Sequence, residues 1–389
     1  MSETVALTTF AAADRDELRR ALEDPSAGEA ATQPARWRAA IAAESSEELG
    51  ERAAELAALL DAGDPRPITG ARGAFVGSCE ARARVGFLFP GQGAPVQTAA
   101  GALGDLIPEA AAVYDLVDMP EQVPPQLVQL AVVTSSLSAL RALRALGIDA
   151  DVAVGHSLGE LTALHWGGAL PERSLLRAAR ARGSVMTSHT TAGTMASILS
   201  DEEAFERVVS RTGGAVTVAC FNSPRQRVVS GPVDAVEQAV EHAKAEGARA
   251  ARLNVVGAFH SPLMRPAVPQ LERRLADEEI RTLERPVIST VTGAELDPDT
   301  DLRRLLARQL EEPVRFVEAA SAAVERVDLL FEVGPGKILT GLVRELTDKP
   351  CVPLRAGEAS PRPIYEAVAA AWAAGLDVTA PDPRVLAER

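Results

Sequence analysis

Short apolar runs that end in glycine-rich loops mark out most of the chain. VGFLF at residues 85–89 is followed by PGQG, and DVAVG at residues 151–155 is followed by HSLGE. Runs of this length without polar alternation are typical of strands buried on both faces of a parallel sheet. Residues 127–146 carry apolar side chains at helical spacing and stop at Gly147, which predicts a helix between the two strands. The alternation predicts an α/β fold with a parallel sheet.

A different rhythm occupies residues 193–256, where candidate elements follow in the order β-α-β-β-α-β and end on the strand candidate ARLNVV. This order predicts an inserted ferredoxin-like subdomain. The flanking residues 84–192 and 257–361 would then form one core. RPVISTVTG and VDLLFEVGPG supply further strands of that core.

The two ends of the chain differ from the middle. From Asp14 to about Ala62 the pattern is largely helical, and GDPRPITGARG breaks it with Pro and Gly. We therefore expect residues 1–83 to form a helical linker domain before the core. Residues 362–389 are expected to add a tail helix or linker.

Composition and charge narrow the class of protein. The 389 residues are 47% hydrophobic and 24% charged, as in a soluble globular protein with room for two or three packed units. The net charge of −14 argues against nucleic acid or membrane as a partner. The three cysteines have no metal-ligand spacing, no stretch approaches the roughly 18 apolar residues of a membrane span, and the N-terminus lacks signal-peptide features. A cytoplasmic protein is expected.

Residues 155–159, GHSLG, match the GxSxG nucleophile elbow. In this motif two glycines allow a sharp strand-to-helix turn that exposes the serine hydroxyl. The apolar strand before Ser157 and the helix after it agree with that interpretation. A serine that merely caps the helix would give the same pattern.

A serine hydroxyl is a weak nucleophile and needs a base, for which five histidines are available. His156 precedes Ser157 in the elbow, so its side chain should point away from the hydroxyl. His260 lies in the loop VVGAFHSPLM, where the inserted segment rejoins the core. This position favours His260 as the base, and a structural histidine is the alternative.

Two further features are candidates for binding a polar substrate. The backbone N–H groups of PGQG at residues 90–93 could join that of Leu158 in holding an oxyanion. A phosphate-binding loop is the alternative, although the Lys-Ser/Thr of a Walker loop and the spacing of a dinucleotide fingerprint are missing. Arg182 lies on an alanine-rich helix. If buried, it would suit bidentate capture of a carboxylate, and otherwise it is a surface arginine.

Six segments, in this order, resemble the malonyl-CoA:acyl-carrier-protein transacylase family: FLFPGQG, GHSLGE, ARGSVM, GAFHSPLM, QLEEPVRF and EVGPGKILTGL. More narrowly they resemble the acyltransferase domains of polyketide synthases. The resemblance runs from about Val85 to Val343. The N-terminal segment is similar to a linker between ketosynthase and acyltransferase, and the whole pattern is similar to the acyltransferase of an iterative enediyne-type synthase.

The resemblance implies an α/β-hydrolase-like core in which Ser157 is acylated and His260 activates it. The carbonyl of Gln309 would steady His260, so that an amide replaces the acid of a triad. Backbone N–H groups of Gln92 and Leu158 would form the oxyanion hole. No metal or redox cofactor is expected.

The substrate contacts implied by the family come from four side chains: Arg182, Phe259, Met186 and His156. Arg182 matches the residue that pairs with the free carboxylate of malonate. Phe259, before the histidine, goes with malonyl where Ser goes with methylmalonyl, and Leu158 points the same way. The chain departs from the pattern at Gly257, where many malonyl-type domains carry His, and in the stretch GAPVQTAAG, which makes selectivity less firmly implied than the chemistry.

The implied reaction moves a malonyl group from malonyl-CoA to Ser157 and then to the phosphopantetheine thiol of an acyl carrier protein. The carrier would dock at the cleft between core and insert, guided by local arginines, beside other domains of a multidomain synthase. Two alternatives stay open. One is an esterase or thioesterase with the same serine and histidine, and the other is a docking module without activity.

Overall fold

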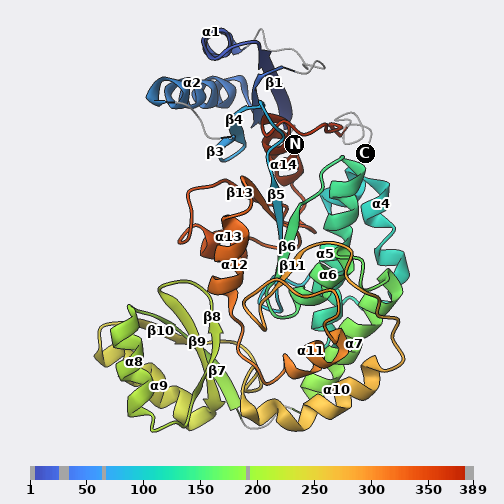
Figure 1. The fold of residues 1–389 in the computed structure, drawn as a ribbon, viewed down its shortest axis with the longest axis vertical. Helices are drawn as coiled ribbons and strands as arrows, with labels where there is room; N and C mark the ends of the chain where they lie inside the picture. Colours follow the sequence, from blue (N-terminus) through green and yellow to red (C-terminus); the bar gives the residue numbers. More distant parts are fainter. Residues whose placement is uncertain (1–4, 26–34, 64–66, 190–192, 382–389) are drawn as a thin grey trace.

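The computed structural model describes residues 5–25, 35–63, 67–189 and 193–381 (Figure 1). Within these residues the strands form three sheets, two of four strands and one of five. The sheets follow one another along the long axis of the molecule, with the five-stranded sheet in the middle (Figure 1).

The central sheet is parallel and confirms the predicted α/β fold. Its strands are β5 (Val85–Phe89), β6 (Val152–Gly155), β11 (Val287–Ser289), β12 (Leu329–Glu332) and β13 (Cys351–Pro353). They lie in the order β11-β6-β5-β12-β13, so the chain winds outward from β5 in both directions. In sheets wound this way, loops at the carboxyl ends of the strands form the crevice that receives ligands.

Alternating side chains of β5 explain why helices cover both faces of the central sheet. Phe87 and Phe89 join one buried cluster, while Leu88 joins another on the opposite face. The first cluster includes α5 (Val128–Ala145), α6 (Gly159–Trp166) and α7 (Glu172–Ser188), and the second includes α12 (Phe316–Val324) and α13 (Ile338–Val343). A strand buried on both faces needs apolar residues at every position, as VGFLF has.

Shorter helices extend the α5–α7 side: α3 (Ala102–Leu106), α4 (Pro108–Ala111), α10 (Val268–Leu275) and α11 (Leu302–Arg308). This part of the described chain also contains 3-10 turns at Tyr114–Leu116, Pro125–Leu127 and Pro262–Ala267. The segment Pro125–Ala145 has the length and hydropathy of a membrane span, but 78% of its most apolar window is buried inside the molecule. Burial against the sheet accounts for its apolar composition.

The inserted segment forms an antiparallel sheet in the order β10-β7-β9-β8. Its elements are β7 (Gly193–Leu199), α8 (Glu202–Arg211), β8 (Thr217–Phe221), β9 (Gln226–Pro232), α9 (Val233–Ala245) and β10 (Arg249–Arg252). Ala196 and Ile198 pack with α8 and α9, whereas Met195 packs with the central sheet. One face is therefore covered by its own helices and the other faces the core.

The last strand of this sheet lies earlier than predicted. ARLNVV at 251–256 was expected to be the strand, but β10 ends at Arg252. Leu253 still donates its N–H to the Met195 carbonyl at 2.9 Å, and residues 254–256 then line a cavity instead of continuing the sheet. Apolar residues that face a cavity have the same pattern as a buried strand.

The prediction of a helical N-terminal domain is wrong in part. The described residues before the core contain two helices, α1 (Arg15–Glu23) and α2 (Ser46–Ala62), and also a four-stranded antiparallel sheet. Its strands, in sheet order, are β1 (Ala6–Ala12), β2 (Trp37–Ala43), β4 (Ala74–Ser78) and β3 (Thr69–Ala71).

The strand β2 shows why the sequence was misleading. Ala39 and Ile41 pack toward α1 and α2, while Ala40 and Ala42 belong to the large core cluster on the other face. A strand buried on both faces shows no period-two alternation. Four of its seven residues are alanine, which favours a helix by intrinsic propensity.

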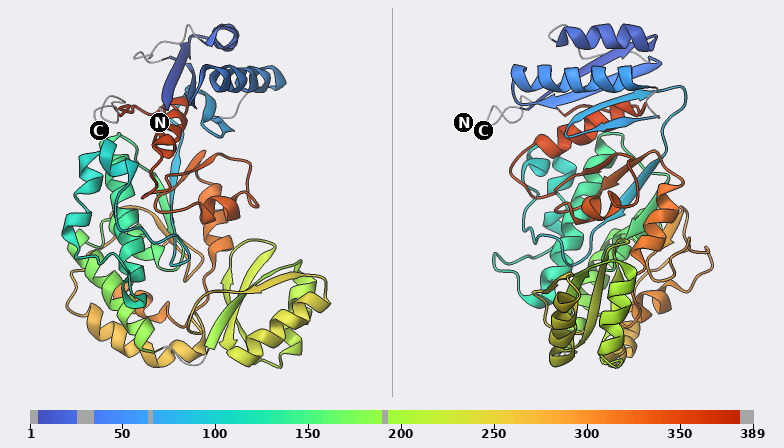
Figure 2. Two further views of the ribbon diagram at one scale, coloured as in Figure 1. Left: turned by 180° about the vertical axis from the view of Figure 1, so that it is seen from behind. Right: turned by 90° about the vertical axis from the view of Figure 1, so that its left-hand side faces the viewer.

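The predicted tail helix is present as α14 (Arg362–Ala373). It packs against β2 and β4, and lies between the N-terminal sheet and the central sheet (Figure 2). The Arg38 guanidinium of β2 lies 4.3 Å from the centre of the Trp372 ring, and it donates to the Leu376 carbonyl at 3.3 Å. The first and last parts of the described chain are thus packed together.

Candidate active site

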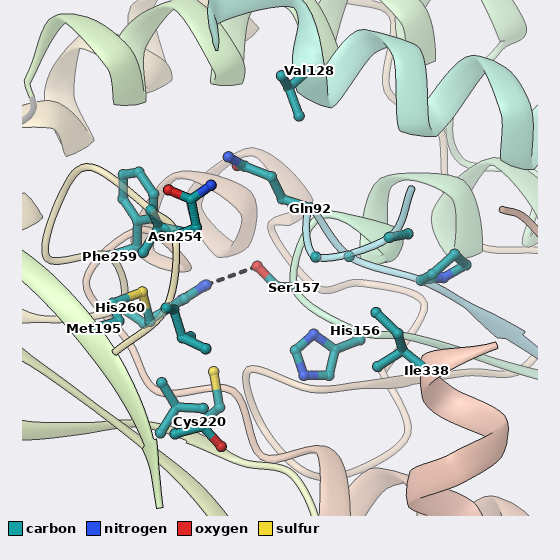
Figure 3. Close-up of a pocket in the computed structure, with 18 of the residues that line it drawn as sticks. Gln92, Val128, His156, Ser157, Met195, Cys220, Asn254, Phe259, His260 and Ile338 are labelled. Atoms are coloured by element: carbon teal, nitrogen blue, oxygen red, sulfur yellow. Dashed lines mark hydrogen bonds between the residues drawn. The ribbon is translucent and has the colours of Figure 1, made fainter. Parts of the chain in front are cut away.

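A cavity of about 990 Å³ lies between the loops of the central sheet and the inserted sheet (Figure 3). The core lines it with Ser157, His260 and Arg182, among others. The inserted sheet contributes a separate set: Met195, Ser197, Cys220, Asn222, Gln226 and Val228. The cavity therefore brings together residues that lie far apart in the sequence.

Ser157 and His260 are hydrogen-bonded in this cavity. The distance between Ser157 Oγ and His260 Nε2 is 2.8 Å, and the two side chains point toward each other (Figure 3). His260 Nδ1 lies 2.9 Å from the carbonyl oxygen of Gln309 and 3.0 Å from that of Glu312. Carbonyls only accept, so Nδ1 carries the proton and Nε2 is free to accept the serine proton.

Both residues of this pair have strained backbones. Ser157 has φ 50° and His260 has φ 56°, in the left-handed region that non-glycine residues rarely adopt. The glycines on either side of the serine are required by packing. A Cβ on Gly155 would collide with the backbone of α6, and one on Gly159 would collide with the Phe89 carbonyl. The GHSLG segment thus has the sharp turn of a nucleophile elbow.

His260 is buried as a neutral imidazole. Burial lowers its pKa to about 3, and the nearby positive charge of Arg182 contributes to the shift. A neutral ring is the form that can accept a proton from serine.

Arg182 is a buried residue, so the alternative of a surface arginine is wrong. Its Nη1 donates to Gln129 Oε1 at 2.9 Å, and its Nη2 donates to Gln309 Oε1 at 3.1 Å and to Ser157 Oγ at 3.2 Å. Its Nε has no partner among the described residues. Burial lowers the pKa of Arg182 to about 10, so the guanidinium is still charged near neutral pH. Within the described chain no carboxylate touches it, which leaves a cationic site open to an anion.

A carbonyl of Gln309 contacts His260, as the resemblance implied. The oxygen that receives His260 Nδ1–H belongs to the main chain and not to the side-chain amide. The amide instead donates from Nε2 to the Ser157 carbonyl at 3.0 Å and accepts from Arg182. A main-chain acceptor does not depend on the residue type, which is why the sequence could not distinguish the two contacts.

The predicted oxyanion donors lie in two loops at this end of the sheet. Gln92 follows β5, and Leu158 begins the turn into α6. Among the described residues, neither main-chain N–H has a hydrogen-bond acceptor. The Gln92 side chain accepts from Gln129 Nε2 at 2.8 Å, which fixes the loop against α5.

The remaining predicted contacts also line the cavity: Met186, Phe259 and His156. His156 Nε2 lies 2.8 Å from Asn222 Oδ1, and its ring packs 5.3 Å from that of Phe316, so it is directed away from the Ser157 hydroxyl as expected. It joins the elbow to the inserted sheet.

Two polar residues of the site were not singled out from the sequence. Gln129 links Gln92 to Arg182 from within the apolar run VQLAVV. Glu160, the last letter of GHSLGE, is completely buried and accepts hydrogen bonds from Ser289, Thr290 and Gln309. A carboxylate at the start of an otherwise buried helix was the sequence feature that could have indicated it.

Comparison with known proteins agrees with this geometry. The acyl transferase domain family matches residues 112–349. The chain belongs to this family. The malonyl CoA-acyl carrier protein transacylase of Bacillus subtilis (strain 168) is 36% identical to this acyl transferase domain over an alignment of 288 residues, which covers 68% of this chain and 90% of that protein.

Polyketide synthases are also similar to this acyl transferase domain. GfsA of Streptomyces halstedii is 34% identical over an alignment of 258 residues, which covers 64% of this chain but only 3% of that synthase. The crystal structure of the acyltransferase domain of the iterative polyketide synthase in enediyne biosynthesis superposes with a TM-score of 0.81 at 35% identity, covering 97% of this chain and 98% of that one. The predicted resemblance is thereby confirmed.

Proposed function

We propose that this acyltransferase moves a malonyl group from malonyl-CoA, through an ester on Ser157, to the phosphopantetheine thiol of an acyl carrier protein in polyketide synthesis. One observation carries the proposal. A serine–histidine pair shares its cavity with a buried arginine that contacts no carboxylate among the described residues. Such a site can accept an acyl group that ends in its own carboxylate.

In the first half-reaction, His260 Nε2 takes the Ser157 proton while Oγ attacks the thioester carbonyl carbon. The main-chain N–H groups of Gln92 and Leu158 donate to the oxyanion that forms. When the tetrahedral intermediate collapses, the carbon–sulfur bond breaks and coenzyme A leaves with the proton from His260. The main-chain carbonyls of Gln309 and Glu312 stabilise the transient imidazolium, less strongly than a carboxylate would.

In the second half-reaction, the carrier thiol gives its proton to His260 and attacks the ester carbonyl. Collapse breaks the bond to Ser157 Oγ, which regains the proton from His260. The sequence is ping-pong, and it needs no metal or redox cofactor.

Arg182 holds the malonyl carboxylate in this scheme. Its contact with Ser157 Oγ is a hydrogen bond that the arriving substrate would replace. Phe259 fills the space that an α-methyl group would need and so favours malonyl over methylmalonyl. One methyl group in a pocket is worth about 1–3 kcal/mol of discrimination. Met186 and His156 form further walls of the acyl pocket.

The proposal includes a division of the chain. Residues 193–256 are assigned as a ferredoxin-like subdomain, supported by their β-α-β-β-α-β order and antiparallel sheet. Residues 84–192 and 257–361 are the hydrolase-like core, residues 1–83 the linker from a preceding ketosynthase, and residues 362–389 a tail. The carrier protein is placed at the cleft between core and insert, and the enzyme in the cytoplasm.

The test is the intact-protein mass after brief incubation with malonyl-CoA, methylmalonyl-CoA or acetyl-CoA. We expect a malonyl adduct on the wild type, no adduct on Ser157→Ala, and an unchanged adduct on Ser184→Ala, a control at an exposed serine of α7. Adding carrier protein should move the malonyl group to its thiol faster than to water. Release to water alone would favour a hydrolase, and absence of any adduct would contradict the acyl-enzyme.

A further inference from the structure

Gln309 is the point where the parts of the site meet. Its main-chain carbonyl accepts from His260, its amide oxygen accepts from Arg182, and its amide nitrogen donates to the Ser157 carbonyl and to Glu160 Oε2, the last two at 3.0 Å each. Any rotation of this amide would therefore disturb the arginine. The residue that fixes the Gln309 amide therefore also controls the position of Arg182 in the substrate site.

The orientation of the amide follows from its partners. The Ser157 carbonyl and the Glu160 carboxylate can accept, while the Arg182 guanidinium can only donate. The NH₂ group must therefore face Glu160, and the amide oxygen must face Arg182. Removing the acceptor at Glu160 would weaken this preference.

Glu160 is itself held by two hydroxyl groups at the end of β11. Ser289 Oγ donates to its Oε1, and Thr290 Oγ1 donates to its Oε2 at 3.1 Å. The side chain is completely buried. A rigid strand thus anchors the carboxylate, and the carboxylate anchors Gln309.

We propose that Glu160 is a positioning residue: it fixes Gln309 so that Arg182 points at the substrate carboxylate, and it supplies the negative charge that Arg182 lacks until that carboxylate arrives. The inference rests on the proposed function, because it takes Arg182 as the receptor of the acyl carboxylate. Among the described residues, the charged group that faces Glu160 is Arg182, which lies on the other side of the Gln309 amide. The other neighbours of the Glu160 carboxylate are the neutral side chains of Ser289, Thr290 and Gln309.

This arrangement implies that the protonation state of Glu160 changes when the substrate binds. When the malonyl carboxylate binds, two carboxylates share one guanidinium, and Glu160 takes up a proton from solvent. Burial raises the pKa of Glu160 to about 7, which brings this exchange within reach near neutral pH. The protonated acid still offers an oxygen to Gln309, so the amide keeps its orientation in both states.

The first experiment measures kcat/KM for acylation by malonyl-CoA and by acetyl-CoA, which share coenzyme A but differ in the carboxylate. Glu160→Ala should lower the malonyl value at least roughly tenfold more than the acetyl value. Glu160→Gln keeps an acceptor for Gln309 and should restore most of this loss. An equal loss for both donors in Glu160→Ala would mean that Glu160 only stabilises the fold, and would overturn the proposal.

The second experiment follows KM for the two donors between pH 6 and pH 9, a range chosen to bracket roughly this pKa. In the wild type, KM for malonyl-CoA should rise up to about tenfold per pH unit above the pKa of Glu160, and KM for acetyl-CoA should not. Glu160→Gln should abolish the rise, while Glu272→Gln, at an exposed carboxylate of α10, should retain it. If the alanine variant does not fold, a rise that persists in Glu160→Gln still refutes the idea. A wild type that takes no malonyl group would instead refute the proposed function.

Discussion

The two walls of the cavity differ in what they contribute. The core wall holds Ser157, His260 and Arg182, which are joined by hydrogen bonds and completely or almost completely buried. The inserted sheet presents side chains such as Met195 and Cys220, and none of its described residues hydrogen-bonds to those three. The polar network therefore belongs to the core wall, and the inserted sheet adds side chains that shape the cavity.

This difference makes a clear expectation for variants. Changes on the core wall should alter rates by orders of magnitude, and changes on the inserted wall should alter binding and stability slightly.

The largest expected effect is at His260. His260→Ala should lower the acylation rate by about 10³-fold or more, because the serine loses its base. Single-turnover kinetics by quenched-flow mass spectrometry would measure it, and a loss below about tenfold would assign the base to another group.

Arg182 should show a smaller, donor-dependent effect. Arg182→Met keeps the length of the side chain but removes the charge, and should lower kcat/KM for malonyl-CoA by about 10²-fold while leaving acetyl-CoA within a few-fold. The control is Arg180→Met, an exposed arginine of the same helix. Equal losses with both donors would show that Arg182 supports the fold and not the substrate.

Phe259 lies on the loop by which the inserted sheet rejoins the core. A change there shows how a residue located between the two walls affects the choice of acyl group. Phe259→Ser should raise the ratio of methylmalonyl to malonyl transfer by about tenfold, since the ring no longer fills the α-methyl space. Competition between the two donors, read by adduct mass, gives the ratio directly. An unchanged ratio would move the selectivity to another side chain.

The inserted wall itself should respond weakly. Cys220→Ala removes a buried thiol and should cost about 1 kcal/mol in the free energy of unfolding, with acylation rates changed less than about threefold. Urea unfolding and the mass assay together check both numbers. A large loss of rate would show that the inserted sheet takes part in chemistry.

Lowering the pH should not protonate His260 in the range in which activity can be measured. Because burial holds the pKa of His260 at about 3, kcat/KM for acetyl-CoA should stay flat as pH falls from about 8 to about 5. The group would have to gain a proton to lose activity, and it does so only near its own pKa. A fall centred near the ordinary histidine pKa would show that the ring is far more solvated than its buried position indicates.

The sequence singled out the side chains that meet in the cavity better than it did the groups that hold them. The elbow around Ser157 follows from local glycine spacing, and His260 and Arg182 follow from family motifs. The resemblance implied a carbonyl of Gln309 beside His260, but the sequence could not tell the main-chain carbonyl from that of the side chain, because any residue there offers a main-chain carbonyl. Glu160 was missed because its partners come from β11 and α11, far away in the sequence.

For the fold, too, some parts could be predicted from the sequence and one could not. The central sheet was predicted from strands whose buried runs are bounded by glycine, and the inserted sheet from its alternation of elements. The N-terminal sheet was missed because β2 is rich in alanine and buried on both sides. That burial depends on α14, which a local pattern cannot reveal.

The position of α14 has a consequence for synthesis on the ribosome. One face of β2 is covered by a helix that begins at Arg362, more than 300 residues later. Until that helix has left the exit tunnel, the N-terminal sheet must wait with an apolar face uncovered, since contacts between distant segments form late. Although the N-terminal sheet is synthesised before the central sheet, it is therefore completed only after the central sheet has been made.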